Sequence, residues 1–145
     1  MAEGPELEKG EKVLREIRAD KARYWRDHAM LALVAMVLVG LVLWLLGNEY
    51  APLAPIAAIA AIGVRGLYMA SEVLGSRWWL TNRRLVLPDG RRSVMLLEIE
   101  TVRRLMGDIQ IITRAGDKHL LKHIGDPESV VGDIVAARKR RKAAQ

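Results

Sequence analysis

Two histidines and two glutamates have spacings that could support metal binding or acid–base catalysis. His119 and His123 are four residues apart, which is a zinc-ligand spacing on a helix. The sequence around them predicts a strand instead, along which residues four apart lie roughly 13 Å from each other. Glu98 and Glu100 are two apart on another predicted strand and share one face, for which solvation is the simpler interpretation. No cysteine and no nearby carboxylate cluster completes a site at the histidines, so we expect no metal site, and acid–base chemistry at the glutamates would need a pocket that the sequence does not show.

Nucleophilic and phosphate-binding motifs are also missing from the sequence. There is no cysteine, and no serine, histidine and aspartate stand in a recognisable catalytic context. Gly63, Gly66 and Gly75 lie in or beside an apolar segment and form no phosphate-binding loop. We therefore expect no catalytic residues and no cofactor. An enzyme or a transporter is the disfavoured class.

Pairs and runs of arginine are the strongest polar feature of the chain. Near an anionic leaflet each Lys or Arg contributes about 1 kcal/mol of attraction. We expect a diffuse basic surface that contacts lipid headgroups or an acidic partner. A retention and topology signal, together with a solvated sheet face, is the alternative. The candidate contact residues are Arg83, Arg84, Arg91, Arg92, Arg103, Arg104, Arg138, Arg140 and Arg141.

The basic excess is confined to the C-terminal part of the chain. Residues 1–28 carry seven basic and seven acidic side chains, whereas residues 76–145 carry fifteen and eight, a net charge of +7. A basic domain tethered to a bilayer meets anionic lipid before it meets nucleic acid. We expect anionic membrane lipids among the partners and no nucleic acid.

Two apolar segments separated by a short turn indicate a membrane hairpin. Residues 29–46 contain no charge, and eighteen helical residues at about 1.5 Å each approach the thickness of the hydrocarbon core. Residues 50–64 are also uncharged. We expect a two-helix transmembrane hairpin over residues 29–75, and no secretory signal, because a long charged segment precedes it. A small face for close helix approach is formed by Ala51, Ala54, Ala58 and Ala61.

Basic residues predict how this hairpin is oriented. They flank both outer ends of the hairpin and are absent from the connecting turn, so both termini are expected in the cytoplasm. Arg65 is expected to snorkel to the interface, and an intramembrane pair with Glu72 is the alternative. The flanking basic residues are Lys21, Arg23, Arg26, Arg65, Arg77, Arg83 and Arg84.

The N-terminal residues 1–28 are predicted as a cytoplasmic tail followed by an interfacial helix over residues 11–28. Tyr24 and Trp25 stand just before the apolar run, where aromatic side chains suit the headgroup level. A plain solvated helix is the alternative. One face of this helix is expected to carry Val13, Leu14, Ile17, Lys21 and Tyr24.

After Ser76 the apolar pattern changes to short strands punctuated by turn residues. Asp126 as N-cap and Pro127 at the first helical position then begin a helix. Its apolar stripe is formed by Val130, Val131, Ile134 and Val135. We expect a small α+β domain over residues 76–145, a curved antiparallel sheet capped by a C-terminal helix. The strands are predicted at residues 77–81, 84–88, 91–97, 99–105, 109–113 and 118–124.

Four short motifs in this region carry a resemblance to a known family. They are residues 79–87, with an aromatic-x-L-T-x-x-R-L pattern, residues 96–102, residues 107–116, and Asp126-Pro127. Together with the two preceding apolar segments, they resemble the bacterial pleckstrin-homology-like proteins of the YdbS-like type. The resemblance implies a pleckstrin-homology-like domain and a multi-pass protein of the bacterial inner membrane. It implies no reaction.

These observations favour a non-enzymatic, membrane-tethered interaction module. We expect an accessory subunit or assembly factor of a larger membrane protein complex, with other membrane proteins as partners. The alternative is an anionic-lipid-binding sensor or regulator at the inner membrane. Homo-oligomerisation stays open, because two helices alone bury little lipid-facing surface.

Overall fold

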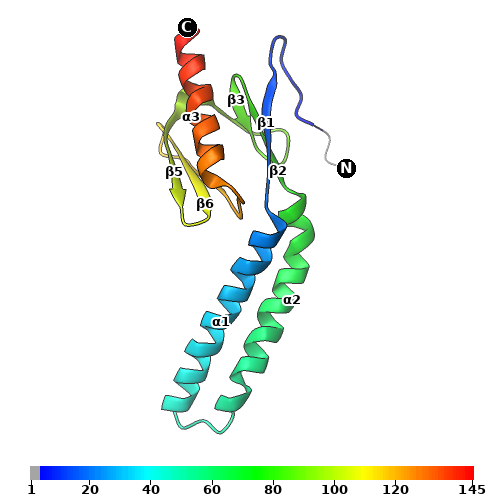
Figure 1. The fold of residues 1–145 in the computed structure, drawn as a ribbon, viewed down its shortest axis with the longest axis vertical. Helices are drawn as coiled ribbons and strands as arrows, with labels where there is room; N and C mark the ends of the chain where they lie inside the picture. The colour runs from blue at the N-terminus through cyan, green and yellow to red at the C-terminus, as the bar shows by residue number, and fades with distance from the viewer. Residues whose placement is uncertain (1–3) are drawn as a thin grey trace. The chain divides into compact units, whose positions relative to one another are not determined.

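The computed structural model describes residues 4–145 of the chain. It contains two compact units: one is the helical unit Lys21–Leu74, and the other combines the residues up to Asp20 with Gly75–Gln145. We call the second the sheet unit. Its chain is discontinuous, because the helical unit is inserted between the first and second strands (Figure 1).

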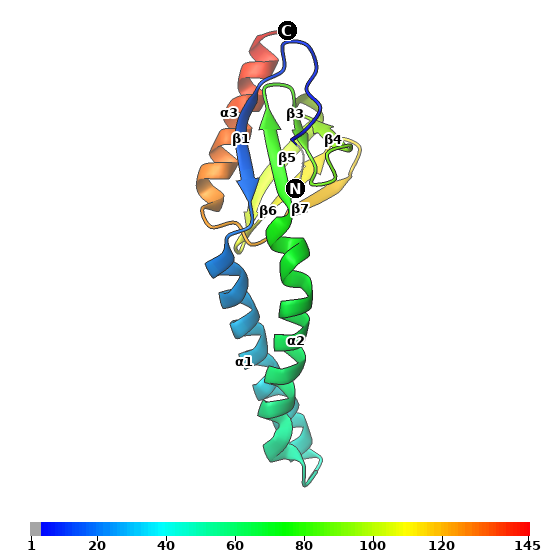
Figure 2. The same ribbon diagram turned by 90° about the vertical axis from the view of Figure 1, so that its right-hand side faces the viewer.

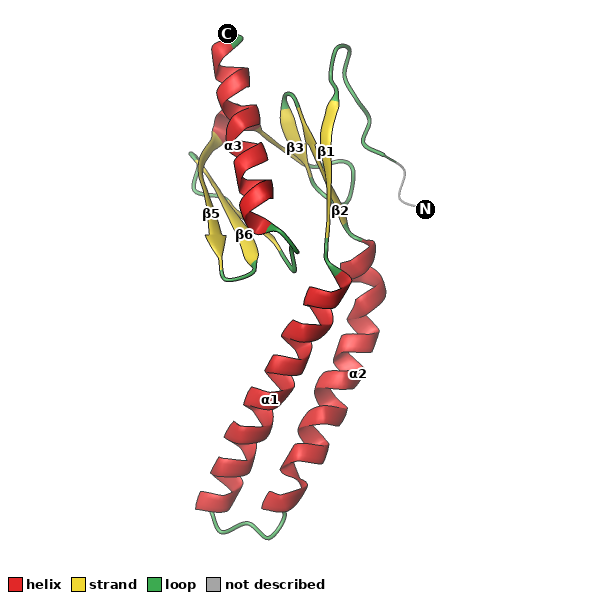
Figure 3. Ribbon diagram, viewed as in Figure 1, coloured by secondary structure: helices red, strands yellow, loops and turns green. Residues whose placement is uncertain are grey.

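The helical unit contains two long helices, α1 (Lys21–Leu45) and α2 (Ala54–Gly75), joined through the 3₁₀ helix η1 (Ala51–Leu53) (Figure 3). Both long helices are long and apolar enough to cross a membrane. Pro52 and Pro55 fall in the first turns of η1 and α2, where a missing backbone N–H removes no intrahelical hydrogen bond. Two helices of suitable length thus occupy the segments in which the membrane hairpin is expected.

Small residues lie at the points where α1 and α2 contact each other. Ala54, Ala58 and Gly66 of α2 are buried, so the predicted small face is confirmed at Ala54 and Ala58, whereas Ala51 is partly exposed and Ala61 is exposed. The hydroxyl of Tyr24 donates a hydrogen bond of 2.6 Å to the carbonyl of Gly66. A Cβ atom at Gly66 would lie 3.1 Å from the His28 ring, so only glycine fits there without displacing that ring.

The sheet unit contains two antiparallel sheets and one long helix. The strand order is β1-β2-β3-β4 in the first sheet and β5-β6-β7 in the second, where a single curved sheet was predicted. The 3₁₀ helix η2 (Leu96–Glu98) joins the sheets, and α3 (Pro127–Ala143) follows the last strand. The strands are β1 (Val13–Arg18), β2 (Arg77–Thr81), β3 (Arg84–Val86), β4 (Ser93–Met95), β5 (Ile99–Leu105), β6 (Asp108–Thr113) and β7 (Lys118–Leu121).

The prediction of a helix over residues 11–28 is wrong in its first half. Val13–Arg18 forms β1, which pairs antiparallel with β2, and helix α1 begins only at Lys21. Ile17 is 2% exposed and belongs to the core, while its neighbours Glu16 and Arg18 are more exposed, an alternation that suits a strand. The backbone groups of β1 find their hydrogen-bond partners on β2. The residues around 13–18 contain no signal for this distant partner strand.

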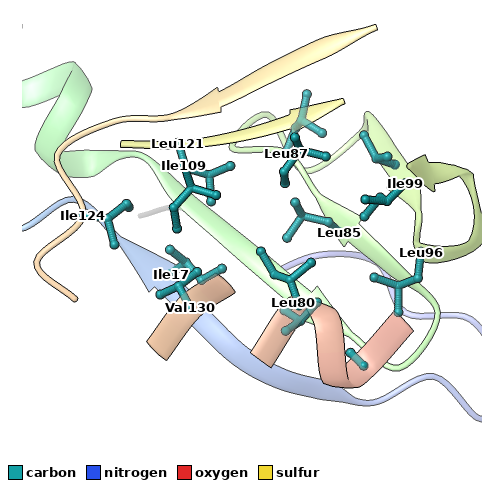
Figure 4. Packing of buried hydrophobic residues seen from close by; sticks show 14 residues of the cluster. Ile17, Leu80, Leu85, Leu87, Leu96, Ile99, Ile109, Leu121, Ile124 and Val130 are labelled. Carbon is teal, nitrogen blue, oxygen red and sulfur yellow. The ribbon is translucent and has the colours of Figure 1, made fainter. Parts of the chain in front are cut away.

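The core of the sheet unit lies between the two sheets and α3 (Figure 4). Leu80 and Leu85 contribute from the first sheet, and Ile109 and Leu121 from the second, each at most 1% exposed. Burying side chains of this size contributes about 1.5–3 kcal/mol each. The core therefore needs β1, both sheets and α3 together.

Helix α3 begins as the sequence predicts. Asp126 is the N-cap and accepts a hydrogen bond of 3.2 Å from the backbone N–H of Ser129, and Pro127 follows at the first turn. Val130 and Ile134 are buried, as predicted. Val135 is instead 46% exposed, and Ala137 is buried in its place, because residues three and four apart share the inner face of a helix.

The two ends of the sheet unit differ in what they connect to. Strands β1 and β2 run side by side (Figure 2). Their last paired residues are Arg18 and Arg77, close in sequence to the start of α1 and the end of α2. We call this the attachment end. The opposite end of the same ladder, at the pair Val13↔Thr81, is the distal end.

Helix α3 and strand β5 run in opposite directions between these ends. Gly125, just before α3, lies against Asp20, where a Cβ at Gly125 would be 3.1 Å from the Asp20 side chain. At the other end of α3, Arg138 donates a hydrogen bond of 3.2 Å to the carbonyl of Glu100, near the start of β5. Helix α3 thus begins at the attachment end and runs toward the distal end.

Candidate functional site

The nine candidate arginines do not form one surface. Arg83 and Arg84 follow the distal end of β2, whereas Arg103 and Arg104 lie in the last part of β5, toward the attachment end. Arg91 and Arg92 lie on the turn between β3 and β4. The remaining three, Arg138, Arg140 and Arg141, are in the last turns of α3.

Arg84 is bound to a buried glutamate of the N-terminal segment. Its Nε atom lies 2.9 Å from Glu11 Oε1, and its Nη2 atom donates to Glu11 Oε2 at 3.1 Å. The Thr81 hydroxyl donates to the same carboxylate at 2.7 Å. The Glu11 side chain is 0% exposed and that of Arg84 is 18% exposed. Such two-point arginine–carboxylate contacts are among the strongest hydrogen-bonded pairs.

The surroundings of Glu11 keep its carboxylate ionised. Burial raises the pKa of Glu11, but hydrogen bonds from Arg84, from the backbone of Glu8 and from Thr81 outweigh burial and lower the pKa to about 2. The same contact with Glu11 raises the pKa of Arg84. A buried ion pair of this kind depends on both partners, because either one alone would be an uncompensated charge.

Arg83 and Asn82 hold the same N-terminal segment. Arg83 donates to Glu8 Oε2 and to the carbonyl of Lys9, both at 3.1 Å. The backbone N–H of Lys12 donates to the side-chain oxygen of Asn82 at 2.9 Å, and the N–H of Asn82 donates to the carbonyl of Lys12 at 3.1 Å. Arg83 and Arg84 therefore fasten residues of the chain itself, a role that the sequence analysis missed.

Sequence reasoning missed Glu11 and Thr81 for a definite reason. They are 70 residues apart and meet only because β1 pairs with β2. The one local signal is the polar group Thr81-Asn82-Arg83-Arg84 between two apolar strands, which predicts a turn but not its partner.

Most of the other candidate arginines have partners at the surface. Arg92 lies 2.7 Å from Asp89, and its side-chain hydrogen bond is the main reason that the pKa of Asp89 falls to about 2. Arg103 donates to Gln110 at 2.7 Å, and Arg104 pairs with Glu128 at 2.8 Å. Within residues 4–145, the side chains of Arg91, Arg140 and Arg141 have no hydrogen-bond or ion-pair partner, although the backbone N–H of Arg91 donates to Asp89 at 3.0 Å.

One cavity of about 780 Å³ opens between the N-terminal segment and the turn after β3. Arg84 and Arg91 line it, together with the acidic Glu6, Glu8 and Asp89. This mixture of charges favours no anionic ligand. A second cavity, of about 490 Å³, is lined by Glu98 and His119 among others.

The histidines and glutamates considered for chemistry do not form a metal centre in the part of the chain that the structure describes. His119 lies on β7, and His123 follows that strand with φ +56°. The carbonyl of Glu100 accepts a hydrogen bond from Arg138, while Glu98 lies in η2.

Comparisons with protein-family models, with curated proteins and with solved structures gave no match. The resemblance to the YdbS-like family therefore stays a prediction.

Proposed function

We propose that the protein is a non-enzymatic, membrane-tethered interaction module that binds an acidic partner protein. In this proposal α1 and α2 span the bacterial inner membrane, both termini are cytoplasmic, and the sheet unit is a pleckstrin-homology-like domain. Two apolar helices of spanning length, two antiparallel sheets and a C-terminal helix support it. The partner would belong to a larger membrane complex, for which this chain is an accessory subunit or assembly factor.

The observation that carries the proposal is the place of the basic run 138–142. Arg140 lies thirteen residues after Pro127, which is about 20 Å along α3 from the attachment end. Electrostatic attraction between exposed charges is screened within about 8 Å at physiological ionic strength. Charges at the attachment end of the sheet unit are thus out of range of Arg140 and Arg141, and an acidic protein is the ligand that we propose for this run.

The experiment is native purification of the full chain in mild detergent, with identification of co-purifying chains at low and high salt. The variant Arg140→Gln with Arg141→Gln removes two charges from the distal end. The control Arg91→Gln with Lys122→Gln removes two charges elsewhere. We expect a stoichiometric partner that is lost from the variant and at high salt but retained by the control. A partner held equally by both variants contradicts the assignment of Arg140 and Arg141.

A lipid sensor is the second candidate, and the position of Arg103 and Arg104 favours it. Both are exposed on β5 toward the attachment end, the side on which the chain enters α1. If no partner co-purifies and the protein binds anionic vesicles through Arg103 and Arg104, the sensor replaces the accessory subunit. Nanodiscs with and without anionic lipid would distinguish the two.

A further inference from the structure

Arg65 is an exposed charged residue in the apolar helix α2, directly after the uncharged residues 50–64. Within residues 4–145 its side chain has no hydrogen-bond or ion-pair partner, so the expected alternative, a pair with Glu72, does not form. A charged side chain on a membrane-spanning helix is costly unless a partner or a polar layer receives it. The depth of Arg65 in the membrane therefore decides what it can bind.

Contacts within the helical unit show which residues of α1 and α2 are level with each other. The two helices run antiparallel (Figure 3), and a Cβ atom at Gly40 would lie 3.9 Å from that of Ala54. His28 is twelve residues before Gly40 and Gly66 is twelve residues after Ala54, so equal helical rise brings His28 level with Gly66. The close approach of Gly66 to the His28 ring agrees with this register. Arg65 is thus level with the region of His28.

This level coincides with the edge of the uncharged part of α1. Residues 29–46 carry no charge, and Asp27 is the last charged residue before them. Eighteen helical residues span about 27 Å, close to a hydrocarbon core of about 30 Å. Asp27 and Arg65 are therefore the first charges beyond the same apolar layer. Along α2 alone Arg65 is in the middle of the helix, and its packing against α1 places it at the membrane interface.

The residues of α2 that follow Arg65 lie beyond this apolar layer. In the same register, residues 66–73 of α2 are level with residues 21–28 of α1, which carry most of the charges of the helical unit. Tyr68 and Trp25 belong to these two segments, and aromatic side chains of their kind favour the headgroup level. The composition of this layer thus agrees with the depth given by the contacts.

Arg65 and Tyr68 are three residues apart, so they are neighbours on one face of α2. Both are exposed, Tyr68 by 84%. A long helical side chain leans over the turn that precedes it, so Tyr68 reaches back toward the level of Arg65. A guanidinium and a phenol thus offer N–H and O–H donors next to each other at headgroup level. Phosphate, which arginine binds through two parallel hydrogen bonds, is the acceptor that phospholipids present there.

We propose that Arg65 and Tyr68 bind the phosphate group of one phospholipid, in the leaflet that surrounds the start of α1 and the end of α2. Arg26 of α1 is exposed at nearly the same level, but no residue three or four positions from it carries a hydroxyl group. The pair on α2 is therefore the better phosphate site. This inference rests on the membrane-spanning hairpin of the proposed function, and it does not depend on the partner protein.

The test is native mass spectrometry of the full chain in detergent with added phosphatidylglycerol, which counts the lipids bound to each chain. Arg65→Gln removes the guanidinium, Tyr68→Phe removes only the hydroxyl, and Arg26→Gln is the charge-matched control. We expect Arg65→Gln to lower the fraction of chains with one bound lipid several-fold, and Tyr68→Phe to lower it less. Arg26→Gln should leave this fraction unchanged, and all three variants should keep the melting temperature of the parent chain.

Three results of this experiment would overturn the site. Undiminished lipid binding by Arg65→Gln shows that the guanidinium holds no phosphate. Equal losses in Arg65→Gln and Arg26→Gln show a diffuse attraction between basic residues and headgroups. Inorganic phosphate in excess should not displace the lipid, because its acyl chains also contact α2. Displacement by inorganic phosphate would assign the two side chains to a free anion in place of a lipid.

A second measurement separates the depth of Arg65 from the membrane-spanning hairpin. The chain has no cysteine, so single thiols can be placed at two exposed positions, Leu67→Cys beyond the apolar layer and Leu38→Cys in its middle. Both are treated in nanodiscs with a charged, water-soluble maleimide. We expect a several-fold faster reaction at position 67. Slow reactions at both positions overturn the depth assigned to Arg65 and leave the hairpin standing, whereas fast reactions at both contradict the membrane-spanning hairpin itself.

Discussion

At the distal end of the sheet unit, Arg84 holds a carboxylate whose side chain is 0% exposed, whereas toward the attachment end Arg104 meets Glu128, whose side chain is 78% exposed. In the sequence each of the two is the second residue of an Arg-Arg dipeptide that is followed by leucine. Their distances to the acidic partner are also similar, 2.9 Å and 2.8 Å. The two pairs differ in their exposure to solvent. Removing one partner of a buried pair leaves an uncompensated buried charge, whereas water screens an exposed pair and makes its contribution to stability small.

The largest effect is expected from breaking the buried pair. Arg84→Met leaves the Glu11 carboxylate buried without its cation and should destabilise the sheet unit by about 3–5 kcal/mol. Urea unfolding of the full chain in detergent, followed through Trp78 and Trp79 of β2, measures it. The double variant Glu11→Gln with Arg84→Met should recover most of the loss. If the single variant unfolds like the parent chain, the pair does not hold the N-terminal segment.

Acid should release the distal end before the attachment end. The pKa of Glu11 is lowered from 4.5 to about 2, so its stabilising contribution is complete above pH 4.5 and is lost as the pH falls toward 2. A shift of this size corresponds to about 3 kcal/mol. Hydrogen exchange of the β1 amides, measured between pH 5 and about pH 2.5 and corrected for the intrinsic rate, should show the loss. In Glu11→Gln this pH dependence should be reduced.

A change at Met106, in the turn between β5 and β6, extends the comparison to the attachment end. Met106→Gly removes the cost of a side chain at φ +57°, so the free energy of unfolding should stay the same or rise by up to about 1 kcal/mol. Thermal unfolding in detergent measures this change. A clear loss of stability would mean that Met106 packs within the fold.

The smallest effect is expected for the exposed pair. Arg104→Gln breaks the contact with Glu128 in solvent and should change stability by less than about 1 kcal/mol. The same urea titration as for Arg84→Met gives the comparison directly. A loss of stability as large as that of Arg84→Met would contradict the inference that the exposed pair contributes less than the buried pair.

The sequence allowed much of the fold to be predicted where the signals are local. The apolar lengths of the two helices, the strand at 77–81 and the cap at Asp126 depend on neighbours in the chain, and the structure confirms them. Residues 13–18 were misread because their partner strand comes about 60 residues later. The sequence predicts both Ile134 and Val135 in the core, because both side chains are apolar. Packing of α3 against the sheets buries Ile134 and leaves Val135 exposed.

The candidate site was less predictable than the fold. A run of arginines reports charge but not the acidic residue that each side chain will meet. Glu11 and Arg84 are 73 residues apart, and Met106 is unusual only through its φ and its exposure. These properties arise from tertiary structure, so composition and spacing contain no signal for them.

The insertion of the helical unit between β1 and β2 has a consequence for the order of folding during synthesis. Strand β1 leaves the ribosome first, but its partner β2 follows only after both long helices have been made. Until then Ile17 has no core to enter, because most of that core is supplied by later residues. The pairing of Arg18 with Arg77 also requires the chain to return to the side from which it left. The sheet unit can therefore be completed only after the two long helices have formed and have brought the chain back to β1.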